Sequence, residues 1–400
     1  MKKFNVNILL FVAAMLFIVA GFSKEYLLEL KYAFASFVVQ NEDAAEDLPA
    51  MLKQVDEIAT KQLRYHNELL DINSVKHSVA NEKIIQKGDM TIIKVDENSL
   101  VRENKQVSME DIQLSVDVIS KLQQYTQKNG GEFLYIAAPE KGINLSFPDN
   151  KSNYYQYNHT VFVSALENAH IPVLDLAKEM DLAGMLNSDA YFRTDHHWKP
   201  EVGFWANGKI CETLQTNYGF TYDPAMTDLN NYSVKIYKDW FLGSYGKKVG
   251  LHFTSAGADD IALITPKFET NLTEMQPYKD QKRTGSFEET ALYLENIQRK
   301  DYYKLNSYAA YSGGDFRLQI LKNNLNPEGK KIVILRDSFA CVVTPFLALN
   351  AGEVHCVDVR DMLPTEEINV YEYIAEIQPD YVLVLYNGSV TDVHDRLNLD

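Results

Sequence analysis

The strongest constraint on the fold is an alternation of short apolar runs with stretches of helical spacing. Residues 133–138 are apolar throughout and end at Pro139, and residues 332–335 form a second run of this kind. Short continuous apolar runs are typical of strands buried on both faces of a parallel sheet. Residues 109–128 have helical spacing and stop at Asn129-Gly130-Gly131. A strand–helix–strand series of this kind predicts an α/β fold with helices on both faces of a parallel sheet.

Other elements extend the series. The pattern predicts strands at 90–95, 171–176, 354–359 and 381–385, and helices at 161–169, 339–349 and 366–377. Residues 212–305 interrupt it, because they are rich in Asn, Thr, Tyr and Gly and contain short alternating segments; we interpret them as a β-rich insertion. Residues 25–84 alternate apolar and charged residues at helical spacing and predict a helical stalk. The main domain is therefore expected to cover residues 85–400.

The N-terminus predicts a membrane anchor over residues 1–24. Lys2 and Lys3 precede an uncharged stretch over residues 4–23. A helix needs about 20 residues to span a bilayer, and lysines at its head keep that end inside. The alternative is a cleaved signal peptide, for which Ile18-Val19-Ala20 is a weak cleavage site. Both place the rest of the chain outside the cytoplasm, so we expect a single-pass protein of the cell membrane, or a secreted one.

Charge and cysteine content narrow the class further. The formal net charge of −16 repels phosphates, so a nucleic-acid partner is not expected. The odd number of cysteines leaves at least one thiol free. Cys211, Cys341 and Cys356 each lie in apolar sequence, which favours buried thiols over a disulfide or a metal site.

The first group of candidate site residues is Thr194-Asp195-His196-His197-Trp198, which lies before Pro200. Residues before a proline tend to be extended, and in an extended segment residues i and i+2 point the same way. Asp195 is therefore expected beside His197, where a carboxylate can orient an imidazole for proton transfer. Two other interpretations remain open, half of a metal site or a surface loop.

The second group surrounds Ser338. The apolar run at 332–335 is followed by Arg336-Asp337-Ser338-Phe339 and a predicted helix. Parallel α/β sheets carry their sites at the carboxyl ends of strands, and free N–H groups at a helix start can hold an oxyanion. Ser338 is thus a candidate nucleophile. The alternative is that Asp337 or Ser338 only caps the helix.

Two further residues follow later strands. Asn387 ends the predicted strand at 381–385, and its amide could donate to the same oxyanion if that strand neighbours the Ser338 strand. The alternative is a plain Asn-Gly turn. Arg360 follows the predicted strand at 354–359 and either meets a substrate carboxylate or pairs with Asp358 or Asp361.

Together, Thr194-Asp195-His196-His197-Trp198 and Arg336-Asp337-Ser338-Phe339 resemble the DHHW proteins of Gram-positive bacteria, which are similar to the alginate O-acetylation proteins. Smaller segments support the resemblance, such as Ala137-Ala138-Pro139-Glu140-Lys141 and Tyr311-Ser312-Gly313-Gly314-Asp315. It covers roughly residues 85–400 and implies an SGNH hydrolase-like three-layer α/β/α fold. Two departures stand out. Arg336 replaces the glycine of the usual Gly-Asp-Ser, and Asp315 stands where asparagine is commoner.

The resemblance assigns roles to the candidate residues. Ser338 matches the nucleophile, His197 the base and Asp195 its orienter, with Asn387 in the third conserved block and no cofactor or metal. It implies acyl transfer through a serine ester, giving acetylation or deacetylation of a cell-surface polysaccharide. A membrane-bound acyl-export protein of the MBOAT type is the implied partner. Two other hypotheses remain: a non-catalytic cell-wall glycan-binding protein that uses the insertion, and a metallohydrolase built on Asp195 and His196.

Overall fold

The computed structural model describes residues 66–96, 98–360 and 368–387. The chain divides into two units, residues 1–80 and 81–400. In the first unit, the helix α4 (His66–Val79) falls in the predicted stalk. The predicted anchor, residues 1–24, lies outside the described residues. Among the helices that are described, none is both long enough and apolar enough to span a bilayer.

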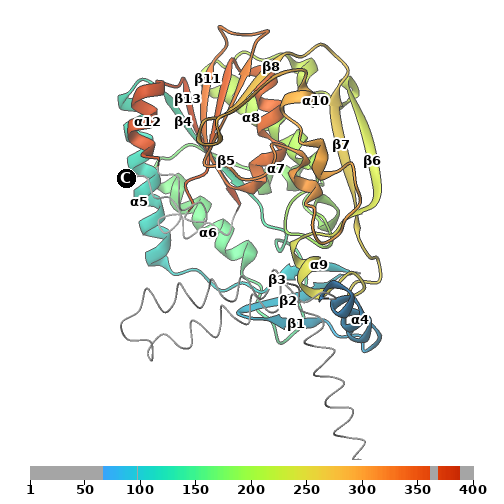
Figure 1. Cartoon of the computed structure of the whole chain (residues 1–400). Helices are drawn as coiled ribbons and strands as arrows, with labels where there is room; N and C mark the ends of the chain where they lie inside the picture. Colours follow the sequence, from blue (N-terminus) through green and yellow to red (C-terminus); the bar gives the residue numbers. More distant parts are fainter. Residues whose placement is uncertain (1–65, 97, 361–367, 388–400) are drawn as a thin grey trace, which may run out of the picture. The chain divides into compact units, whose positions relative to one another are not determined.

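The second unit is organised around one sheet of eight strands (Figure 1). In spatial order the strands are β5 (Val173–Asp175), β4 (Glu132–Ala138), β13 (Tyr381–Asn387), β11 (Lys331–Arg336), β12 (Glu353–Val357), β10 (Leu318–Asn323), β8 (Leu272–Gln276) and β9 (Gln281–Gly285). The first five strands are mutually parallel. Each of the last three pairs antiparallel with the strand before it in this order. The predicted α/β sheet is present. It is a mixed sheet, however, whereas the sequence predicted a parallel one.

Helices cover both faces of the sheet, as the alternating series predicts. One face packs on α5 (Met109–Lys128), α6 (Tyr155–Asn168) and α12 (Val370–Ile377), through strand residues such as Tyr135 and Val333. The other packs on α7 (Leu176–Leu182), α8 (Pro200–Tyr218) and α11 (Thr344–Asn350), through their neighbours Leu134 and Ile334. Figure 1 shows the two helical layers on either side of the strands. Successive residues of each strand thus enter different cores, which explains the continuous apolar runs.

The predicted insertion is more closely integrated than expected. Its first residues complete α8, and β8 and β9 extend the main sheet. Only β6 (Tyr232–Phe241) and β7 (Asp259–Pro266) form a separate two-stranded sheet. The short helices α9 (Ser244–Val249) and α10 (Phe287–Thr290) complete this region. A further three-stranded sheet consists of β1 (Ile84–Lys87), β2 (Met90–Val95) and β3 (Ser99–Arg102), of which the sequence predicted β2 alone.

The segment after β11 also differs from the predicted single helix at 339–349. A 3-10 turn, η7 (Ser338–Val342), comes first, and α11 begins at Thr344. Pro345 lies in the first turn of α11, where its missing N–H costs no hydrogen bond. A proline at this position starts a new helix more readily than it continues one.

Candidate active site

Ser338 follows the carboxyl end of β11 at the centre of the sheet, where the sequence places it. The turn is fixed by Asp337, which is 2% exposed. Its Oδ1 accepts the Phe339 N–H at 2.8 Å and its Oδ2 accepts the Asn387 N–H at 2.9 Å. Asp337 is therefore the predicted cap, and it also joins the nucleophile turn to the end of β13.

Three side chains form a continuous chain of hydrogen bonds. The Nε2 atom of His197 lies 2.7 Å from Ser338 Oγ, and its Nδ1 atom lies 2.5 Å from Asp195 Oδ1. Asp195 and His197 are 2% and 7% exposed. The arrangement is that of a nucleophile, a base and an orienting carboxylate.

The local reason for the Asp195–His197 contact is not the one predicted. Residues 193–197 bend and do not form an extended segment. Asp195 Oδ1 accepts the backbone N–H of His197 at 2.9 Å, which closes a turn of the Asx type. In an extended segment His196 would face away from His197, whereas in the structure the centroids of the two rings lie 3.9 Å apart. Trp198 is buried, and its indole N–H donates to the Phe339 carbonyl at 3.1 Å.

The second oxygen of Asp195 is held by the first residue of α9. Asp195 Oδ2 accepts the Ser244 N–H at 2.5 Å. Burial raises the pKa of Asp195, but the charges of His196 and His197 and these hydrogen bonds outweigh it, so the pKa lies well below its usual value. The carboxylate is therefore ionised at neutral pH and can stabilise an imidazolium.

Two buried charged groups fix the backbone of the same segment, and sequence reasoning missed both roles. Lys141 Nζ lies between 2.6 and 3.0 Å from the carbonyl oxygens of Leu100, Phe192, Arg193 and Asp195. Asp259 accepts the backbone N–H groups of Arg193 and Thr194, both at 2.8 Å. Lys141 belongs to a segment that supports the family resemblance, and that was the only available signal.

The imidazole is also held by an aromatic ring. Tyr308, which is 2% exposed, stacks on His197 with the ring centroids 4.2 Å apart and the planes at 21°. Phe339 packs on the same imidazole at 5.3 Å. These contacts restrict the rotation of His197 about the line that joins Asp195 to Ser338.

The structure brings Asn387 beside the Ser338 turn and pairs Arg360 with two carboxylates. β13 is a direct neighbour of β11, so Asn387 ends beside the nucleophile turn, as its proposed role requires. Arg360 is 14% exposed in its side chain and pairs with Asp358 at 2.5 Å and with Asp315 at 3.1 Å. The predicted pairing of Arg360 with Asp358 is present; contact with a substrate carboxylate stays a prediction.

The two departures from the family pattern explain each other. The fully buried Arg336 donates to Asp315 Oδ1 and to the Gly314 carbonyl, each at 2.8 Å. Burial raises the pKa of Asp315, but Arg336 and Arg360 outweigh it and lower the value. An asparagine at position 315 would leave the buried Arg336 without its salt-bridge partner, whereas Arg360 would keep Asp358, so the aspartate follows from Arg336.

A metal site built on the same histidines competes poorly with the triad. Ligand atoms of Asp195, His196 and His197 lie within 4.8 Å of one another. However, Asp195 already accepts from His197 and Ser244, and the second nitrogen of His197 is engaged by Ser338. Only His196 keeps a partly exposed ring, at 35%, and one imidazole is too few for a zinc site.

Comparison with known proteins supports the resemblance inferred from the sequence. Residues 97–227 match the family described as "SGNH hydrolase-like domain, acetyltransferase AlgX". The chain resembles the DHHW and alginate O-acetylation proteins. No functionally curated protein is similar in sequence. The matched range contains Asp195 and His197 but ends before Ser338.

Solved structures show the same fold over about three quarters of the chain. Bacillus cereus PatB1 is 20% identical, with a TM-score of 0.62 over 76% of this chain and 97% of that one. The same values hold for PatB1 with a sulfonyl adduct. A DHHW family protein from Eubacterium siraeum is 17% identical, with a TM-score of 0.56 over 77% of this chain and 93% of its own. These likenesses establish the SGNH-like fold.

Proposed function

We propose that the chain is an extracytoplasmic serine-dependent O-acetyltransferase or acetylesterase that acts on a cell-surface or cell-wall polysaccharide. The observation that carries the proposal is the hydrogen-bonded series from Ser338 Oγ through His197 to Asp195, with separations of 2.7 and 2.5 Å. The match to an acetyltransferase domain over residues 97–227 supports acetyl as the acyl group.

The first half-reaction forms an acyl-serine. His197 Nε2 takes the Ser338 proton as Oγ attacks the acetyl carbonyl, and Asp195 stabilises the imidazolium. The oxyanion accepts from the Ser338 N–H and from the Asn387 side chain. When the tetrahedral intermediate collapses, the donor oxygen leaves with the proton from His197.

The second half-reaction returns the enzyme to its starting state. A sugar hydroxyl gives its proton to His197 and attacks the acetyl-serine, and Ser338 leaves with that proton. With water as the acceptor, the same steps release acetate. Transfer in the cell would use a membrane-bound acyl-export protein as the partner and the N-terminal segment as the membrane anchor.

The test is hydrolysis of p-nitrophenyl acetate by the purified chain, together with labelling by phenylmethylsulfonyl fluoride read by mass spectrometry. Ser338→Ala should lower kcat by at least about 10³-fold and abolish the adduct. Ser233→Ala removes an exposed serine of β6 and should change neither. Equal rates in the native chain and Ser338→Ala, with no adduct on Ser338, would refute the proposal.

A further inference from the structure

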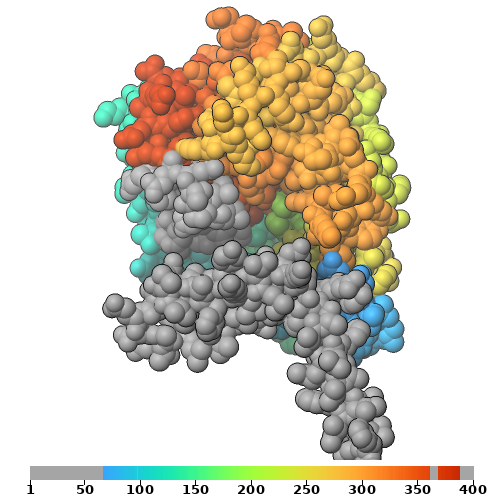
Figure 2. Space-filling view, in the orientation of Figure 1, coloured from blue at the N-terminus to red at the C-terminus, as the bar shows by residue number. Residues whose placement is uncertain are grey.

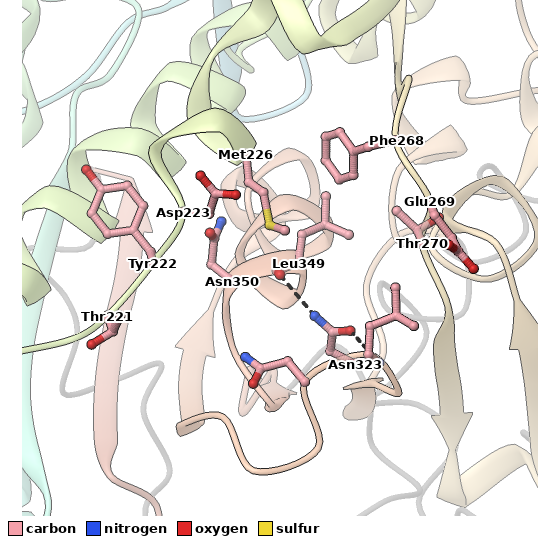
Figure 3. Close-up of a pocket in the computed structure, with 12 residues that line it drawn as sticks. Thr221, Tyr222, Asp223, Met226, Phe268, Glu269, Thr270, Asn323, Leu349 and Asn350 are labelled. Atoms are coloured by element: carbon pink, nitrogen blue, oxygen red, sulfur yellow. Dashed lines mark hydrogen bonds between the residues drawn. The ribbon is translucent and has the colours of Figure 1, made fainter.

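A cavity of about 370 Å³ opens in the second unit, at a place that the proposed reaction does not use. Four segments line it: the chain after α8, the connection between β7 and β8, the end of β10 with the residues that follow it, and the end of α11 (Figure 3). A volume of this size falls within the range of small-molecule sites in proteins.

Sheet topology places the cavity away from Ser338. Asn323 ends β10, beside the first residues of β12, because Lys322 pairs with Glu353. Glu353 in turn pairs with Lys331, the first residue of β11. Ser338 follows the other end of β11. The six residues of that strand span about 16 Å at about 3.3 Å per residue. The cavity therefore lies at the opposite end of β11 from Ser338.

The lining combines an apolar wall with hydrogen-bonding groups. Met226, Phe268 and Leu349 supply the wall, and Asn323, Asn326 and Asn350 supply amides. Figure 3 shows Asn323 bonded within the protein; its Nδ2 donates to the Leu349 carbonyl at 2.9 Å. The amide of Asn323 is therefore engaged within the protein. Asn326 and Asn350 are the candidates for contact with a ligand.

Asn350 carries the strongest indication of a missing partner. Its side chain is 4% exposed, and its Oδ1 atom is buried with no hydrogen-bond partner among the described residues. Its Nδ2 reaches only the Phe346 carbonyl, at 3.5 Å. An unpaired buried oxygen is costly, and the last torsion of asparagine is soft. A ligand hydroxyl reached by rotation about this torsion would supply the missing partner.

The charges around the cavity define the chemical class of the ligand. Asp223 and Glu269 line it, and no lysine or arginine does. The site therefore disfavours phosphates, sulfates and uronic acids. Hydroxyl groups on a ring with an apolar face match a wall of this kind with amides and carboxylates around it. We propose that this cavity binds a neutral sugar unit of a glycan, independently of the chemistry at Ser338.

The experiment uses the full chain and Ser338→Ala, titrated with the methyl β-glycosides of glucose, galactose and N-acetylglucosamine and followed by saturation-transfer NMR. Methyl β-glucuronide is the charged counterpart of the glucoside. At least one neutral glycoside should bind saturably and equally to both proteins. The glucuronide should bind more weakly. Ester turnover is measured separately. Failure of the chain to cleave the ester therefore does not decide whether the cavity binds a glycoside, and failure to bind does not decide whether Ser338 is catalytic.

Three asparagine variants locate the site. Asn326→Leu and Asn350→Leu should each weaken binding about tenfold, as expected for one lost hydrogen bond. Asn230→Leu changes an exposed asparagine outside the cavity and should leave binding unchanged. Because Asn326 is exposed, its variant remains informative if Asn350→Leu fails to fold. Absence of saturable binding, binding insensitive to the cavity variants, or preference for the glucuronide would overturn the proposal.

Discussion

Gly243 lies against Asp195 so closely that one added methyl group should displace the carboxylate. A Cβ atom at position 243 would lie 2.2 Å from Asp195 Cβ and 2.6 Å from Asp195 Oδ2. Ordinary contacts begin at 3.4 Å, so the two carbon atoms must separate by 3.4 − 2.2 = 1.2 Å. The next residue, Ser244, donates its N–H to the same carboxylate, so the shift also disturbs that bond.

The size of the effect follows from this displacement. Misplacement of a catalytic group by about 1 Å costs about 10²-fold in rate, and overpacking of a buried site costs about 1–3 kcal/mol of stability. We therefore expect Gly243→Ala to lower kcat for p-nitrophenyl acetate about 100-fold and to lower Tm.

Gly208→Ala is the matched control. Position 208 lies inside α8, and a Cβ atom there would meet only Thr227 Cβ, at an ordinary 3.6 Å. Alanine in a helix interior is favoured over glycine by about 0.5–1 kcal/mol, so Tm should rise slightly with kcat unchanged. Native kcat and Tm in Gly243→Ala would show that Asp195 does not depend on this close approach.

Further predictions concern the neighbours of the triad. Asp195→Asn should lower kcat for the same ester about 10⁴-fold, because the amide favours the wrong tautomer of the imidazole; an intact kcat would contradict the role of Asp195. Tyr308→Leu should lower kcat and alter its pH profile, and Tyr308→Phe should restore both, since the ring alone stacks on His197. Asp337→Asn should lower the free energy of unfolding in urea by about 1–3 kcal/mol. The NH₂ group of the new asparagine would face the N–H of either Phe339 or Asn387, so that one of these two hydrogen bonds is lost. Burial lowers the pKa of Lys141 to about 7, so the unfolded chain binds more protons than the folded chain between pH 7 and 10. The unfolding free energy should therefore rise across this window, relative to Lys141→Met, by up to about 1.4 kcal/mol per pH unit; parallel urea curves would refute it.

Sequence patterns predicted those elements whose cause is local. α5 begins and ends where the apolar spacing and the Asn129-Gly130-Gly131 stop place it, and β2 matches its predicted limits. β10 was not predicted at all, and its antiparallel pairing with β12 depends on how distant segments return to the sheet. The predicted helix at 339–349 was wrong for a local reason, because Pro345 favours the start of a separate helix at Thr344.

The candidate site shows the same division between local and distant causes. The proximity of Asp195 to His197 was predicted from their spacing, yet the segment that carries them is bent. The bend at residues 193–197 buries many backbone N–H and C=O groups, and these groups need hydrogen-bond partners from other parts of the chain. The Lys141 ammonium lies within hydrogen-bond distance of four carbonyls, Asp259 accepts two backbone N–H groups, and Gly243 packs against the Asp195 carboxylate. A short motif identifies the proposed reacting groups, but their geometry is set by three segments that no local pattern connects. We therefore expect variants at these supporting positions to impair turnover while Ser338, His197 and Asp195 all remain in the sequence.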